Sequence, residues 1–193
     1  PSPLPSMRPT STPTWVPSCS SDEFESFDSS LWSSQCSGCS YSGGSLFVAG
    51  DNQLMRTLET QRISTIKAEF TKDADCDDHF VVLSTDASYT WNWGSVAGAV
   101  SFAFNCNAKY IYGQSASTSV ECNIRALYSV DISVTSSSVS FVDDNCGTLS
   151  LVDSIGTEKV YVYVGADADS PDVAEWHWIE FSSDENSRCS TTT

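Results

Sequence analysis

The stretch Tyr128-Ser129-Val130-Asp131-Ile132-Ser133-Val134-Thr135 alternates between apolar and polar side chains throughout its length. A period of two is that of a β-strand with one buried face, whereas a surface helix would place its apolar residues three and four positions apart. The segment 99–105 has the same period, with Val100, Phe102 and Phe104 on one side. Both stretches therefore predict half-buried strands with a clear core side.

Short segments of this kind recur between Cys19 and Cys189, and no convincing helical period interrupts them. The other predicted strands are 23–27, 45–49, 53–58, 63–70, 79–85, 109–112, 119–125, 138–142, 148–152, 159–165 and 173–181. Turn-forming sequences such as Gly43-Gly44 and Asp143-Asp144-Asn145 separate them. About a dozen short strands in one domain predict an all-β fold, a two-sheet antiparallel β-sandwich or jelly roll.

The first eighteen residues repeat with a period of four, in which Pro is followed by Ser or Thr. Pro removes backbone donors and restricts φ, so this segment is predicted to be an extended, polyproline-like stalk. Its hydroxyl residues are predicted O-glycosylation sites, namely Ser2, Ser6, Thr10, Thr14 and Ser18. The chain thus divides into a stalk over 1–18, a sandwich domain over 19–189, and a polar tail or the start of another linker over 190–193.

The cysteines are even in number and widely scattered: Cys19, Cys36, Cys39, Cys76, Cys106, Cys122, Cys146 and Cys189. This predicts a fold stapled by four disulfides in an oxidising compartment, and hence an extracellular location, secreted or on a cell surface. The connectivity stays open, with Cys19–Cys189, Cys106–Cys122 and Cys76–Cys146 as suggestions. Zinc is disfavoured, because only Cys36 and Cys39 have the Cys-x-x-Cys spacing.

The formal net charge of −16 bears on the partners. A strongly acidic surface repels phosphate backbones and anionic lipids, which argues against nucleic acid and acidic membranes. No stretch is long and apolar enough for membrane insertion. Neutral glycans, cell-surface proteins, cations and further copies of the chain remain as partners.

Two acidic loops are candidate calcium sites, because Ca²⁺ takes six to eight hard oxygen ligands. The candidate ligands are Asp73, Asp75, Asp77 and Asp78 in the first loop, and Asp167, Asp169 and Asp172 in the second. Solvated acidic turns are the alternative, since Asp is common in turns.

Aromatic side chains form a second candidate site. Flat apolar rings stack on the C–H faces of sugars, and a neighbouring Asn can bind hydroxyls. The candidate glycan-binding residues are Trp91, Asn92, Trp93, Tyr110, Tyr112, Tyr161 and Tyr163. The alternative is that these rings pack the core, which is the commoner fate of large aromatic side chains.

The layout of the strands resembles the concanavalin A-like (laminin-G-like) jelly-roll superfamily. The residues that carry the resemblance are Phe24-Glu25-Ser26-Phe27-Asp28-Ser29-Ser30-Leu31-Trp32, Ser42-Gly43-Gly44-Ser45-Leu46, Val160-Tyr161-Val162-Tyr163-Val164-Gly165 and the final Trp178-Ile179-Glu180-Phe181. The stalk separately resembles Pro-Ser-x-x spacers in surface proteins of diatoms and related algae.

The segment Glu175-Trp176-His177-Trp178-Ile179-Glu180 resembles the Glu-x-Asp-x-x-Glu signature of retaining glucanases in the same superfamily. The resemblance implies that Glu175 is a nucleophile and Glu180 an acid/base. His177 replaces the central Asp, and a regular strand would point the two carboxylates to opposite faces, so a bulge is required.

These observations predict a non-catalytic extracellular module, without catalytic residues, that binds a neutral glycan or another surface component in a lectin-like manner, with calcium assistance. One alternative is a structural subunit of a glycosylated cell-surface filament or wall, in which the stalk is part of the assembly. The other is a glycoside hydrolase that uses Glu175 and Glu180.

Overall fold

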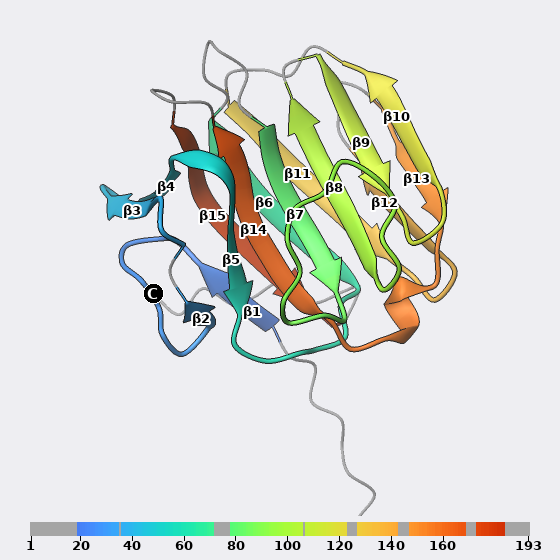
Figure 1. Cartoon of the computed structure of the whole chain (residues 1–193), viewed down its shortest axis with the longest axis horizontal. Helices are drawn as coiled ribbons and strands as arrows, with labels where there is room; N and C mark the ends of the chain where they lie inside the picture. The colour runs from blue at the N-terminus through green and yellow to red at the C-terminus, as the bar shows by residue number, and fades with distance from the viewer. Residues whose placement is uncertain are drawn as a thin grey trace, which may run out of the picture.

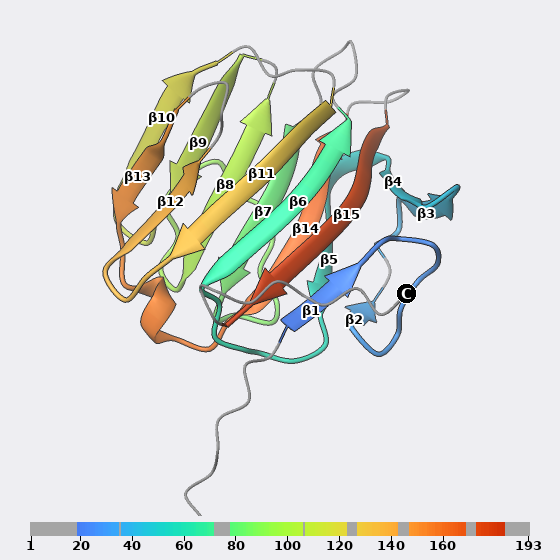
Figure 2. The same cartoon turned by 180° about the vertical axis from the view of Figure 1, so that it is seen from behind.

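The computed structural model describes residues 19–34, 36–71, 78–105, 107–122, 127–142, 147–168 and 173–183. These residues form two antiparallel β-sheets that pack face to face (Figures 1 and 2), which confirms the predicted all-β sandwich. The stalk with its five predicted O-glycosylation sites and the tail 190–193 lie outside the described residues.

Sheet A contains eight strands in the described chain. Their spatial order is β13 (Leu149–Val152), β12 (Ser138–Val142), β11 (Leu127–Val134), β6 (Thr65–Thr71), β15 (Ala174–Ser182), β4 (Ser45–Val48) and β3 (Cys39–Ser42). The eighth strand, β1 (Cys19–Asp22), pairs with the C-terminal half of β15, while β4 pairs with the N-terminal half. Strands far apart in sequence therefore meet in the middle of this sheet.

Sheet B contains seven strands in the same described ranges. Their order is β10 (Ser117–Glu121), β9 (Ala108–Tyr112), β8 (Ala99–Asn105), β7 (Asp78–Ser84), β14 (Tyr161–Ala168), β5 (Gly50–Thr57) and β2 (Trp32–Ser34). One short 3₁₀ helix, η1 (Ile155–Thr157), precedes β14. Within the residues that the structure describes, no helix is long and apolar enough to cross a membrane.

The main core lies between the sheets and uses the faces that the alternation predicts. Val100, Phe102 and Phe104 of β8 are fully buried in it, and so is Ile132 of β11. Burying one such side chain contributes about 1.5–3 kcal/mol. The alternation in β8 and β11 thus fixes which side of each strand faces the other sheet.

The predicted strand at 23–27 is wrong, because β1 ends at Asp22 and a turn follows. The Asp22 carboxylate accepts the Phe24 N–H (2.7 Å), and Phe24 has a φ of 53°. The other Asp22 oxygen accepts the Trp32 indole N–H (2.6 Å), although burial raises the pKa of Asp22. The turn thereby inserts the Phe24 ring into the core between the sheets.

Cys36 and Cys39 form a disulfide, which accounts for their Cys-x-x-Cys spacing without a metal. Cys19 and Cys122 are also disulfide-bonded, and none of the described cysteines is free. Each of the three suggested pairings includes at least one cysteine outside the described residues, among Cys76, Cys106, Cys146 and Cys189, so these pairings stay predictions.

Candidate functional site

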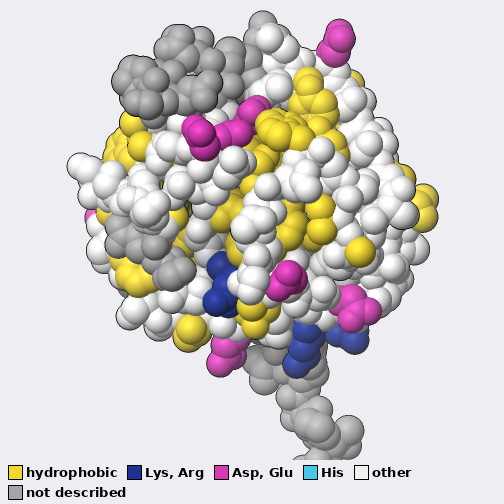
Figure 3. All heavy atoms as spheres, viewed as in Figure 1, with side chains coloured by type: hydrophobic (Ala, Val, Ile, Leu, Met, Phe, Trp, Pro, Cys, Tyr) yellow, Lys and Arg dark blue, Asp and Glu magenta, His cyan; other side chains and the backbone are white. Residues whose placement is uncertain are grey.

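Aromatic side chains gather on the outer face of sheet B, the side turned away from sheet A. Val81 and Leu83 of β7 point into the core, so Phe80 and Val82 point outward. Figure 3 shows hydrophobic side chains over this surface, with acidic side chains at their border. We call this surface the aromatic face, and its rings are Phe80, Tyr89, Trp91, Trp93, Tyr110, Tyr112, Tyr161 and Tyr163.

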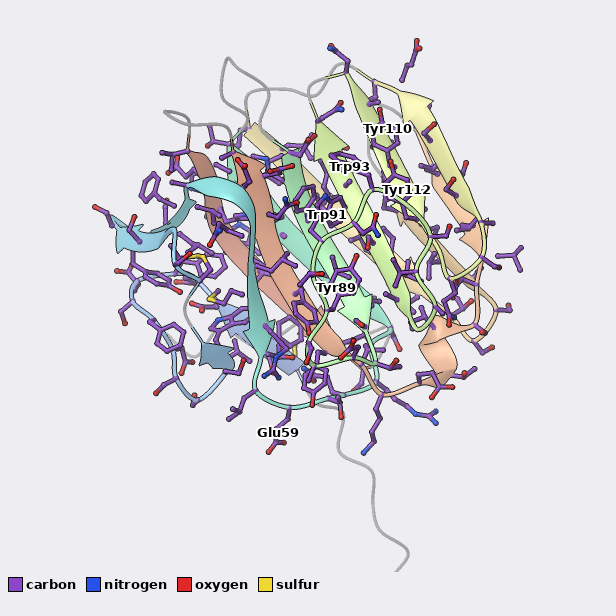
Figure 4. The ribbon with its side chains drawn as sticks, in the orientation of Figure 1. Glu59, Tyr89, Trp91, Trp93, Tyr110 and Tyr112 are labelled. Atoms are coloured by element: carbon purple, nitrogen blue, oxygen red, sulfur yellow. A yellow bond between two sulfur atoms is a disulfide. The ribbon has the colours of Figure 1, made fainter. Side chains whose placement is uncertain are left out.

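The loop 85–98, between β7 and β8, lies over this face and brings two tryptophans to it (Figure 4). The Trp91 ring stacks on Phe80 at 3.5 Å between centroids, with 11° between the planes. Hydrogen bonds to the strands beneath anchor the loop: the hydroxyls of Tyr89 and Ser101 lie 3.0 Å apart, and the Tyr163 hydroxyl donates to the carbonyl of Asp86 (2.7 Å). The loop is thus held in place by the strands beneath it.

Trp93 is the most exposed aromatic ring of this group, at 46%. It packs edge-on against Trp91, Tyr110 and Tyr112, with centroids 5.2–6.1 Å away. Tyr110 and Tyr112 stack on each other 5.8 Å apart, with 7° between their planes. An exposed indole beside two stacked phenols combines flat apolar faces with hydroxyl groups, which is the chemistry that binds sugars.

The indole nitrogen of Trp91 adds a polar feature to the aromatic face. The Trp91 side chain is only 7% exposed, and its Nε1 atom has no hydrogen-bond acceptor among the described residues. An indole N–H can only donate, and buried donors are nearly always satisfied by protein or by ordered water. An oxygen of a bound water or ligand would satisfy it.

The predicted glycan-binding residues therefore fall into two groups. Trp91, Trp93, Tyr110 and Tyr112 come together, and Asn92 is exposed between the two tryptophans. Tyr163 instead lies buried under the loop, and that burial raises its pKa to about 12. Tyr161 lies away from the tryptophans, with the Arg56 guanidinium 4.6 Å from its ring centroid.

Sequence reasoning missed Phe80 and Tyr89. Phe80 belongs to an apolar run that is buried on both faces, so no alternation marks its outward direction. Tyr89 stands two residues before Trp91, and Trp91 two before Trp93, which is the one signal that would have grouped these rings.

Two carboxylates border the aromatic face where β7 begins and β14 ends. Asp78 and Asp167 are direct cross-strand partners, on the same side of the sheet as Phe80 and Tyr163. The Asn52 N–H donates to Asp167 Oδ1 (3.1 Å). Burial raises the pKa of Tyr112, and the charges of Tyr110 and Asp78 raise it further.

Two of the predicted calcium ligands, Asp78 and Asp167, lie within the described residues and are cross-strand partners. Asp73, Asp75, Asp77, Asp169 and Asp172 lie outside the described residues. Within the described ranges, no group of three or more His, Cys, Asp or Glu side chains could hold a metal ion. Calcium binding therefore stays a prediction.

Glu175 and Glu180 lie on the other side of the molecule, on the outer face of sheet A. The required bulge is present, because the register of β15 against β6 shifts between Trp176 and Trp178. As a result Glu175, His177 and Glu180 face outward, while Trp176 and Ile179 are fully buried.

His177 is tied to its neighbours on this face. Its Nε2 lies 2.6 Å from Thr71 Oγ1, its Nδ1 3.2 Å from Ser45 Oγ, and the same Nδ1 3.8 Å from Glu175 Oε1. The cross-strand partners of Glu175 and Glu180 are Thr71 and Lys67, so the two glutamates are separated by about 13 Å along the sheet.

A cavity of about 680 Å³ lies at a third place, near the end of β5. Glu59, Arg62 and Lys159 are among its lining residues. Figure 4 shows Glu59 at the opposite end of the sandwich from Trp93 and Tyr110. This cavity is therefore separate from the aromatic face, and the described residues that line it include no aromatic side chain.

No protein-family model matches the chain, and no curated protein matches it by sequence. Solved structures do share its fold. A native glycosidic hydrolase is similar over 89% of this chain and 98% of its own, with 13% identity and a TM-score of 0.65. The laminarinase catalytic domain from Thermotoga maritima covers 86% of this chain and 97% of its own, at 10% identity and a TM-score of 0.62. A β-1,3-1,4-glucanase (lichenase) from a mouse hindgut metagenome is similar over 84% of this chain and 98% of its own chain. Its sequence identity is 11% and its TM-score is 0.61.

These neighbours correct the sequence-based prediction of function. They are consistent with the predicted concanavalin A-like jelly roll. They are glycoside hydrolases, however, which contradicts the prediction of a non-catalytic lectin-like module and of a structural filament subunit. The glycoside hydrolase alternative agrees with them better.

Proposed function

We propose that the protein is an extracellular glycoside hydrolase that acts on a neutral glycan bound along the aromatic face. The observation that carries the proposal is the half-exposed Trp93 ring beside the stacked Tyr110 and Tyr112 rings. The extracellular location rests on the cysteines, since disulfides persist in oxidising compartments.

The arrangement of the rings suits a sugar chain. Trp93 stands nearly at right angles to Tyr112 (85°), so an apolar sugar face can lie on one ring while its edge contacts the other. The tyrosine hydroxyls and the exposed Asn92 offer donors and acceptors for sugar hydroxyls. Apolar surface with a few convergent polar groups is typical of ligand sites.

The charge of the chain narrows the substrate class. The net charge of −16 disfavours sulfated or carboxylated polymers, because like charges repel. Neutral β-glucans are the first class to test, since two of the structural neighbours are a laminarinase and a β-1,3-1,4-glucanase.

The test is the release of reducing ends from β-1,3-glucan, β-1,3-1,4-glucan and, as a charged polymer, κ-carrageenan. We expect release from at least one neutral glucan and none from carrageenan. Trp93→Ala should lower kcat/KM about tenfold or more, because it removes a stacking surface. Leu58→Ala is the matched control, since Leu58 is exposed to the same degree (48%) beside Glu59, away from the aromatic face.

Two results would contradict the proposal. One is an absence of reducing-end release from every neutral glycan offered to the intact protein. The other is hydrolysis that Trp93→Ala and Leu58→Ala change equally.

A further inference from the structure

We infer that Asp78 and Asp167 are the catalytic carboxylates, with Asp167 as nucleophile and Asp78 as acid and base. The inference rests on the proposed hydrolase function and assigns its chemistry to one end of the aromatic face. Asp78 opens β7, and Asp167 stands near the end of β14, where the register against β5 shifts between Ala166 and Ala168. The ladder between β7 and β14 is regular up to this pair and sets the two residues opposite each other.

The geometry of the sheet sets the spacing of the pair. Asp78 on β7 and Asp167 on β14 are directly opposed, and both point away from the core. Directly opposed residues of antiparallel strands have Cβ atoms about 4.5–5.5 Å apart. A Cβ spacing of this size lets the two carboxyl groups adopt the separation of about 5–5.5 Å that retaining glycosidases use.

The surroundings of the pair fit a bound sugar. Phe80, two residues after Asp78, carries the stacked Trp91 ring. The enclosed Trp91 Nε1, which has no acceptor within the described chain, is a donor that a ligand oxygen could satisfy. The Asp78 charge also contributes to the raised pKa of Tyr112, so the carboxylate lies within electrostatic range of that ring. A sugar on Trp93 and Tyr112 would therefore extend toward the two aspartates.

The contacts of each aspartate suggest its role. Asp167 Oδ1 accepts the backbone N–H of Asn52, which fixes the carboxylate and leaves Oδ2 for a sugar carbon. The Oδ1 atom of Asp78 is buried, whereas the side chain as a whole is half-buried. Its half-buried carboxyl stands directly opposite Asp167, so it is the group that donates a proton to the leaving oxygen.

The reaction balances in two steps. In the first, an oxygen of Asp167 bonds to the anomeric carbon, the glycosidic C–O bond breaks, and the Asp78 carboxyl gives its proton to the leaving oxygen. In the second, Asp78 takes a proton from water, the water oxygen bonds to the anomeric carbon, and the bond to Asp167 breaks. The sum is hydrolysis, which consumes one water molecule.

Glu175 and Glu180 are placed less well for this substrate. They face outward from sheet A, whereas the aromatic face lies on sheet B, so the sandwich separates them from Trp93. The outward-facing His177, tied to Thr71 and Ser45, also lies between them on the strand.

The experiment compares Asp78→Asn and Asp167→Asn with Glu175→Gln in the intact protein, on the neutral glucan that it hydrolyses. Each aspartate variant should lose about a thousandfold or more in kcat, while glucan binding, followed by tryptophan fluorescence, stays within twofold. Asp167→Gly with added azide should regain turnover and form a glycosyl azide, which a purely structural residue would not give. Glu175→Gln should keep wild-type kcat, and unfolding curves check that each variant is folded.

The outcomes separate the two claims. Wild-type protein that releases no reducing ends would overturn the proposed function and this inference with it. Wild-type hydrolysis that both Asp→Asn variants retain, or that Glu175→Gln abolishes, would overturn only the assignment of Asp78 and Asp167.

Discussion

The two outer faces of the sandwich are built from strands of similar length but are covered differently. In β6 and β11 of sheet A, buried side chains alternate with half-buried or exposed ones, and no described segment lies over these strands in Figure 2. In β7 and β8 of sheet B, nearly every side chain is buried, because loop 85–98 and its aromatic rings cover the outer face. One fold therefore presents a polar surface and an aromatic one.

The difference follows from the residues that each sheet places on its outer face. Sheet A's outer face carries hydroxyls and scattered charges, such as the exposed pair of Lys67 and Asp131 (3.6 Å), which contributes little to stability. Sheet B's outer face has small residues such as Ser101 and Ala103 in the middle, which leave room for Trp91 and Tyr89. Of the described rings on this face, Trp93 is the most exposed, and it lies against the two stacked tyrosines.

The largest expected effect comes from removing the base of the aromatic face. Phe80→Ala should lower the free energy of unfolding by about 3–5 kcal/mol, because Phe80 is fully buried and carries the Trp91 stack. Phe47→Ala is the matched change on sheet A, where Phe47 of β4 faces outward and is only half-buried, and it should cost less than about 1 kcal/mol. Urea unfolding with the disulfides intact measures both. Equal losses would contradict the comparison.

A smaller effect concerns the loop anchor at alkaline pH. Burial raises the pKa of Tyr163 to about 12 from the usual value of 10, so folding favours its neutral form. The neutral Tyr163 side chain therefore contributes its full stabilisation below pH 10, and this stabilisation is lost as the pH rises toward 12. At pH 8, Tyr163→Phe should lower the free energy of unfolding by about 1 kcal/mol, because the variant lacks the hydrogen bond to the Asp86 carbonyl. Above pH 10, the free energy of unfolding of the variant should fall less steeply than that of the wild type.

Urea unfolding of wild type and Tyr163→Phe between pH 8 and 11.5 measures this dependence. Some alkaline decline should remain, because burial also raises the pKa of Tyr41 to about 12. If the free energies of unfolding of the two proteins fell in parallel across this pH range, the result would contradict the role of Tyr163 in the alkaline loss of stability.

The sandwich was predictable because alternation in β8 and β11 records which side is buried. The turn after Asp22 was not, since it depends on one side-chain bond to Phe24 and on burial of its ring. Trp91 and Trp93 were predicted to bind glycan, and this stays a prediction. Which strands lie beneath their loop depends on contacts between segments far apart in sequence. The pairing of Asp78 with Asp167 depends on the strand register, which sequence alone does not reveal.

The central claim is that the working face of this protein is the aromatic face of sheet B. The most direct measurement is a crystal structure of Asp167→Asn with an oligosaccharide of the neutral glucan that the wild type hydrolyses. The account predicts sugar rings on Trp93 and Tyr112, with an anomeric carbon beside Asp78. Sugar bound instead on sheet A, over Glu175 and His177, would contradict it.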